Sequence, residues 1–160
     1  MDWEHVVMVS KQELAEGIRF AGRRAAAAAE RTKDWDYRLG HRWTSGDAYR
    51  HIAAVAGGAA RLYPLLDAGV LSSVTVEQAA QNNAASIAAL AGKSREEVIA
   101  AILEGHEASA RFVETLDEAD LATVVKLGGY EMEKAEIIAQ IWIHHSIAHA
   151  YEASARWPIL

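Results

Sequence analysis

The sequence predicts an all-α protein, a four-helix bundle with a long crossover between its second and third helices. Alanine supplies 33 of the 160 residues and proline only two, which favours helix because alanine loses no side-chain entropy on entering one. Apolar residues recur every three or four positions along four long segments, and no stretch alternates as a strand should. We expect one domain over residues 1–160, since a chain of this length buries roughly two-thirds of its unfolded surface.

The first two helices are predicted from their capping residues and apolar stripes. Ser10 with Glu13 has the spacing of a capping box before a helix over residues 11–32. Thr44 or Ser45 can cap a second helix that runs to about Leu66, and Asp47 in its first turn complements the helix dipole. Residues 33–42 have no periodicity and form a connection.

The long connection over residues 67–93 carries a short helix of its own, from about residue 76 to 90. It can span the bundle, so the second and third helices are expected to run parallel. Ser94 with Glu97 then caps a third helix that ends near Asp117. Gly128-Gly129 indicates a turn, and a fourth helix runs from Met132 until Pro158 ends it.

Composition excludes several classes of function. There is no cysteine, so any metal must be bound through nitrogen and oxygen, and any thiol that the chemistry needs must come from outside. A net charge of −6 does not favour binding to nucleic acid or to an anionic membrane surface, because both carry negative charge. The N-terminus does not resemble a signal peptide and no apolar run reaches 18 residues, so we expect a cytoplasmic protein.

Three histidines are the candidate metal ligands. His145 and His149 lie four residues apart, so their imidazoles share one face of the fourth helix. His51 lies four residues before Val55 on the apolar stripe of the second helix, which faces the interior. Three neutral imidazoles with an open coordination position are typical of catalytic zinc sites, and imidazole also suits nickel, iron and copper.

The remaining histidines and the better-known metal motifs fit less well. His144 competes with His145 but has no partner four residues on, and His5, His41 and His106 are expected to be ordinary surface or boundary residues. The residue after His145 is a serine, so the zinc-protease motif with its built-in glutamate base is absent. The Glu-x-x-His pairs of di-iron bundles are absent as well.

These residues resemble the DinB-like metal-binding bundles, which include the mycothiol-dependent maleylpyruvate isomerases and the bacillithiol transferases. That family opens its second helix with a tryptophan, an acidic residue and a histidine at four-residue intervals, and Trp43, Asp47 and His51 stand in that order. His145 and His149 match its histidine pair, and Gln81-Asn82-Asn83 resembles an asparagine-rich turn of the isomerase branch. The similarity covers about residues 10–157. The additional C-terminal domain of the longer isomerases is not expected in this chain.

The resemblance implies a cytoplasmic homodimer with a divalent metal, Zn²⁺ or Ni²⁺, and a thiol S-transferase or isomerase that acts on a small electrophile with a low-molecular-weight thiol as cosubstrate. Asp47 is a candidate to orient His51, or simply to cap its helix. Glu152 is a candidate further ligand or general base, Tyr151 a weaker one, and Asn82 and Asn83 could contact substrate. The alternative is a non-catalytic, metal-stabilised ligand-binding or stress-response bundle.

The expected dimer also has an argument from composition. Trp35, Trp142 and Trp157 are not all expected to fit inside one bundle this rich in alanine, and protein interfaces favour such aromatic side chains.

Overall fold

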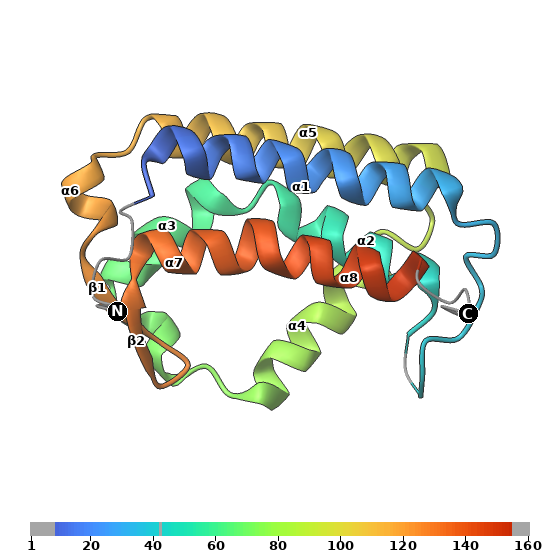
Figure 1. The fold of residues 1–160 in the computed structure, drawn as a ribbon. Coiled ribbons are helices and arrows are strands. Elements are labelled where there is room, and N and C mark those ends of the chain that lie inside the picture. The colour runs from blue at the N-terminus through green and yellow to red at the C-terminus, as the bar shows by residue number, and fades with distance from the viewer. Residues whose placement is uncertain (1–8, 42, 155–160) are drawn as a thin grey trace, which may run out of the picture.

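The computed structural model describes residues 9–41 and 43–154, and most of this part of the chain is helical, as predicted (Figure 1). The elements are, in chain order, α1 (Lys11–Arg31), α2 (Ser45–Ala56), α3 (Ala59–Asp67), η1 (Val70–Ser73), α4 (Val76–Ala89), α5 (Arg95–Glu114), α6 (Glu118–Leu121), β1 (Val124–Leu127), β2 (Tyr130–Glu133), α7 (Lys134–Ala139), η2 (Gln140–His144) and α8 (His145–Ser154).

The long helices pack in two layers. The helices α1 and α5 lie side by side (Figure 1). Helix α2 packs mainly on α5, helix α8 packs mainly on α1, and α2 and α8 contact each other. Helix α4 lies in the connection between α3 and α5, contacts α2, and buries none of its own residues. No helix in the described part of the chain is long and apolar enough to cross a membrane.

The predicted helix starts are confirmed in detail. Capping boxes with both reciprocal hydrogen bonds open α1 at Ser10, α2 at Thr44 and α5 at Ser94. Thr44, not Ser45, is the cap of α2, and Ser45 is buried with its hydroxyl donating to the Ala153 carbonyl at 3.1 Å. These signals are readable from sequence because all their atoms lie within one helical turn.

The second predicted helix is interrupted where an unbroken one was expected. Gly57 and Gly58 separate α2 from α3, and glycine is a poor helix former because it loses most backbone entropy. The glycines also lie where α5 crosses closely. A Cβ on Gly105 would lie 2.6 Å from the Cβ of Ala56 and 2.8 Å from the nitrogen of Gly57.

The expectation that the chain contains no strand was wrong. The strands β1 and β2 form an antiparallel hairpin in which Leu127 pairs with Tyr130. Gly128 and Gly129 form its predicted turn, with φ values of 55° and 88°, a backbone conformation that favours glycine. Each strand has four residues, which is too short for an alternating pattern to stand out from a helical one.

The interior also accommodates a tryptophan that was expected to be hard to place. Trp142 is 2% exposed, and its indole N–H donates to the Val55 carbonyl at 3.1 Å. Trp35 is half-buried against Tyr49, while Trp157 lies outside the described residues. Trp142 therefore gives no support for a dimer, and the dimer stays a prediction.

Candidate metal site

Three imidazoles meet between α2 and α8, two of them from neighbouring turns of α8 and the third, that of His51, from 94 residues earlier in the chain. The possible ligand atoms of His51, His145 and His149 all lie within 4.8 Å of one another. The Nε2 atoms of His51 and His145 are 2.9 Å apart. Two nitrogens at 2.0–2.1 Å from a tetrahedral ion lie about 3.3 Å from each other, so small shifts of these rings would accommodate a divalent ion.

The helical segment that carries two of these histidines is not a regular α-helix. The turn η2, Gln140–His144, is π-helical and ends immediately before His145. A π-helical turn contains an extra residue and therefore changes which side chains after it face a neighbouring helix. Downstream of η2, His145 and His149 lie one α-helical turn apart and both face His51, with ring centroids 4.8 Å and 5.0 Å from its ring.

Burial keeps two of the imidazoles neutral. His51 is 2% exposed, and its pKa is lowered to about 3 by loss of hydration and then by the neighbouring His145 and His149. The pKa of His145 is lowered to about 4 by burial and then by His149. A neutral imidazole offers a lone pair to a metal ion, whereas a protonated one offers none.

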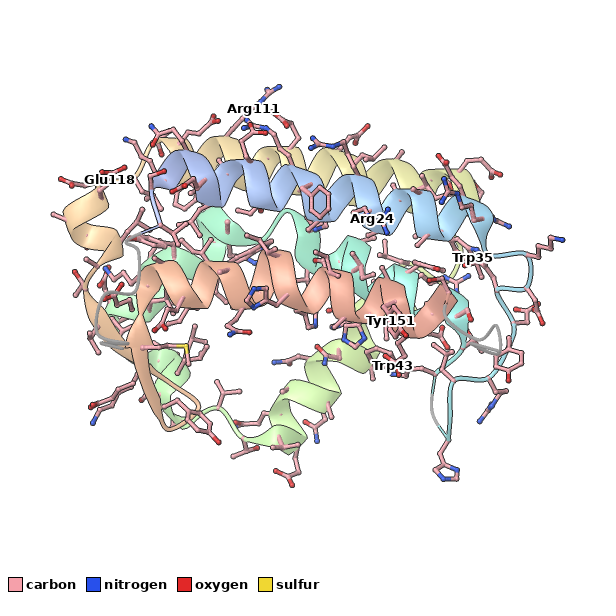
Figure 2. All side chains as sticks on the ribbon, in the orientation of Figure 1. Arg24, Trp35, Trp43, Arg111, Glu118 and Tyr151 are labelled. Carbon is pink, nitrogen blue, oxygen red and sulfur yellow. The ribbon has the colours of Figure 1, made fainter. Side chains whose placement is uncertain are left out.

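An aromatic ring covers one side of the site. Trp43 packs on His51 with ring centroids 4.9 Å apart and on His149 with ring centroids 5.3 Å apart. Figure 2 labels the Trp43 side chain, which lies on the side of α8 that faces α4. It lies in the connection that leads into α2, directly before the capping residue. Its large apolar surface shields the imidazoles from water on that side.

The hydrogen bond proposed between Asp47 and His51 is absent. One oxygen of Asp47 accepts from the backbone N–H of Thr44 at 2.9 Å, and the other lies 3.4 Å from Arg50. The Nδ1 atom of His51 is buried without a hydrogen-bond partner. Asp47 therefore acts here as a helix cap, because its position in the first turn brings the carboxylate to the free N–H groups of α2.

Glu152 contacts the site from one turn beyond His149. Its Oε2 lies 3.0 Å from the Nδ1 of His149. Because a carboxylate can only accept, Nδ1 carries the proton and the Nε2 lone pair is left free. This is the arrangement in which an acidic residue fixes the tautomer and orientation of a metal-binding histidine. The roles of further ligand and general base that the sequence suggested for Glu152 stay predictions.

One histidine that was expected at the surface is buried beside the site. His106 on α5 is 1% exposed, so that expectation was wrong. Its Nδ1 donates to the Ile102 carbonyl at 2.7 Å, and its Nε2 lies 3.0 Å from the Ser146 hydroxyl. Burial lowers its pKa, so the ring is neutral and accepts from Ser146. The available signal was its position four residues after Ile102 on the buried stripe of α5.

The other candidates lie outside the cluster. His144 is exposed, as expected, with its Nδ1 3.3 Å from Gln140. His41 and Tyr151 are also exposed, and His5 lies outside the described residues.

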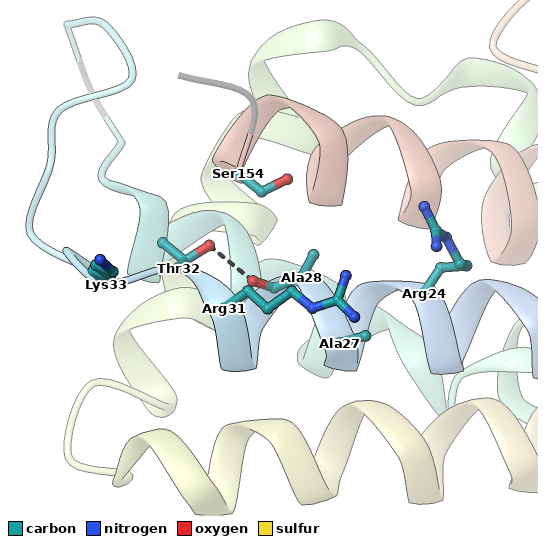
Figure 3. Close-up of a pocket in the computed structure, with 7 residues that line it drawn as sticks. All are labelled: Arg24, Ala27, Ala28, Arg31, Thr32, Lys33 and Ser154. Carbon is teal, nitrogen blue, oxygen red and sulfur yellow. Dashed lines mark hydrogen bonds between the residues drawn. The ribbon is translucent and has the colours of Figure 1, made fainter. Parts of the chain in front are cut away.

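The site opens at His149 onto a cavity of about 780 Å³ between α4, α8 and the start of α2. Trp43, Asp47, Asn83 and Glu152 are among the residues that line it, whereas Asn82 is not. A second cavity, of about 340 Å³, lies between α1 and the end of α8 (Figure 3). None of the three clustered histidines lines this second cavity.

Comparison with known proteins agrees with this geometry. No curated protein and no solved structure matches the chain. A family model described as the DinB superfamily matches residues 10–153. This match covers most of the 160 residues, and the protein therefore belongs to the DinB superfamily.

Proposed function

We propose that this protein is a metal-dependent enzyme, a thiol S-transferase or isomerase that acts on a small electrophile. One observation carries the proposal. Three imidazoles converge, one of them, that of His149, lines a cavity large enough for a small molecule, and no fourth protein ligand joins them among the described residues. A site with three protein ligands and adjacent space is typical of catalysis, whereas structural sites are closed by a fourth ligand.

The chain's own residues have distinct roles in this proposal. His51, His145 and His149 would hold Zn²⁺ or Ni²⁺, Glu152 orients His149, and Trp43 limits water. A divalent ion held there supplies positive charge and an open position that lower the pKa of a bound thiol. The thiol comes from solution, because the chain contains no cysteine.

We also propose that the chain forms a four-helix bundle, that it is a homodimer and that it is cytoplasmic. The packing of α1, α2, α5 and the α7–α8 segment supports a four-helix bundle, with α4 in the crossover. A homodimer and a cytoplasmic location are further proposals that accord with the resemblance. Light scattering at micromolar concentration tests the dimer, and a monomeric mass would contradict it without affecting the metal site.

The function is tested by loading the full chain with cobalt, whose absorption spectrum reports on its ligands. Glutathione, mycothiol and bacillithiol are then titrated in turn, and at least one is expected to change the spectrum and to react faster with an electrophile than without protein. The His144→Ala variant is the control and should respond as the unsubstituted protein does, because the imidazole of His144 lies on the same helical segment but outside the cluster. Cobalt binding with no response to any thiol would favour a metal-stabilised binding protein instead.

A further inference from the structure

The lining of the cavity beside His149 restricts the charge of its ligand. We propose that this cavity takes a molecule with a flat, apolar body whose far end is neutral or cationic, and that it discriminates against an anionic far end. This inference rests on the proposed function only in placing the reactive end of the ligand at the three imidazoles.

One wall of the cavity is an apolar face of α4. Its residues recur at helical spacing and most have the smallest apolar side chain: Ala80, Ala84, Ile87 and Ala88. Ala91, just beyond the end of α4, continues this wall. Leu39 and Trp43 extend this apolar lining from the connection before α2. Small side chains along one helix face leave room for a flat ring, and Trp43 offers an aromatic surface for such a ring to pack against.

The charged groups around the cavity are acidic. Asp47 and Glu152 line it, His41 is the other titratable lining residue besides His149, and no lysine or arginine is among the described lining residues. Arg50 lies 3.4 Å from Asp47 and offsets part of that charge. Glu152 is bonded to His149, whose role as a ligand requires a neutral ring. An anionic group beside these carboxylates would meet like charge, whereas an ammonium group would meet opposite charge.

The second cavity shows the opposite pattern. Arg24, Arg31 and Lys33 line it, beside Thr32 and Ser154 (Figure 3). The cationic and the acidic linings are thus separated, and the acidic one accompanies the imidazole cluster.

Three benzenethiols that differ only at the para position test the proposal on the cobalt-loaded full chain. They carry an aminomethyl, a hydroxymethyl or a carboxylate group, and affinities are corrected for the thiolate fraction of each compound in solution. Because the same sulfur meets the metal in all three, the comparison isolates the far end. We expect the carboxylate compound to bind at least about tenfold more weakly than the hydroxymethyl compound, and the aminomethyl compound to bind as tightly or more tightly.

A positive charge placed in the cavity should favour the carboxylate compound over the aminomethyl compound. Asn83 lines the cavity, and Asn83→Lys is expected to strengthen binding of the carboxylate compound relative to the hydroxymethyl compound. Gln81→Lys is the matched control, because Gln81 is exposed on the same helix and does not line the cavity. An equal effect of both lysines would attribute the change to net charge and overturn the proposal.

The two possible failures are distinguishable. Tighter binding of the carboxylate compound by the unsubstituted protein overturns the charge preference and leaves the thiol function intact. If cobalt binds but no thiol does, the proposed function fails, and ligand-detected NMR with benzylamine and benzoate then tests the cavity alone. Binding of benzylamine in preference to benzoate supports the charge preference, and the reverse overturns it.

Discussion

From the hydrogen bond between Glu152 and His149 we predict how much metal affinity is lost when Glu152 is replaced. Replacing an acidic residue that orients a metal-binding histidine typically weakens metal binding by about 10- to 100-fold. The side chain of Glu152 is 50% exposed, so water can replace part of its interaction. We therefore expect Glu152→Ala to lie at the lower end, about tenfold or about 1.4 kcal/mol.

A second variant separates the charge of Glu152 from its hydrogen bond. Glutamine can still accept from the Nδ1 of His149, but a charge-assisted bond is about twice as strong as a neutral one. Losing about half of the effect predicts a loss of about threefold for Glu152→Gln. A direct metal ligand would behave differently, with both variants losing far more than tenfold.

The assay is competition between the protein and a chromophoric chelator for Zn²⁺, with all variants compared at one fixed pH. Glu104→Ala on α5 is the control for a general effect of lost negative charge, since Glu104 is exposed and does not belong to the imidazole cluster. An unchanged dissociation constant for Glu152→Ala would refute the orienting role.

Three further predictions concern the ligands and the fold. His51→Ala should abolish stoichiometric metal binding in elemental analysis and leave the helicity measured by circular dichroism unchanged. His144→Ala should retain the metal, and the opposite result would show that the wrong histidines have been assigned. Gly105→Ala should cost about 1–3 kcal/mol in urea unfolding, because its Cβ would lie 2.6 Å from a Cβ of α2, and an unchanged midpoint would contradict that crossing. Arg19 and then Arg111 lower the pKa of Glu107 to about 2 from its ordinary value of 4.5. This contribution to stability is present above pH 4.5 and is lost as pH falls toward 2, so an Arg19→Gln variant should show a smaller loss of melting temperature over that interval.

Much of the helical framework is readable from the chain by itself. Serine or threonine caps and acidic residues three positions later lie within one turn, so the starts of α1, α2 and α5 follow from local chemistry. The four-residue spacing of His145 and His149, and the place of His51 on an apolar stripe, were enough to predict which imidazoles would come together. Periodicity carries this information because it depends only on the geometry of one helix.

The partners of the polar side chains required the tertiary structure. Whether Asp47 contacts His51 or only caps its own helix depends on side-chain directions that the sequence pattern leaves open, and the same holds for the bond from Glu152 to His149. The hydroxyl that hydrogen-bonds to the Nε2 of His106 belongs to Ser146, which is 40 residues away.

The backbone irregularities were equally inaccessible to sequence. The π-helical turn before His145 and the break between α2 and α3 arise where helices pack closely, and the hairpin is too short to show a period. His51 and His145 are 94 residues apart, yet their Nε2 atoms lie 2.9 Å from each other. Local rules place each histidine on a helix face, but only the packing of α2 against α8 decides how closely those faces approach and which side chains surround them.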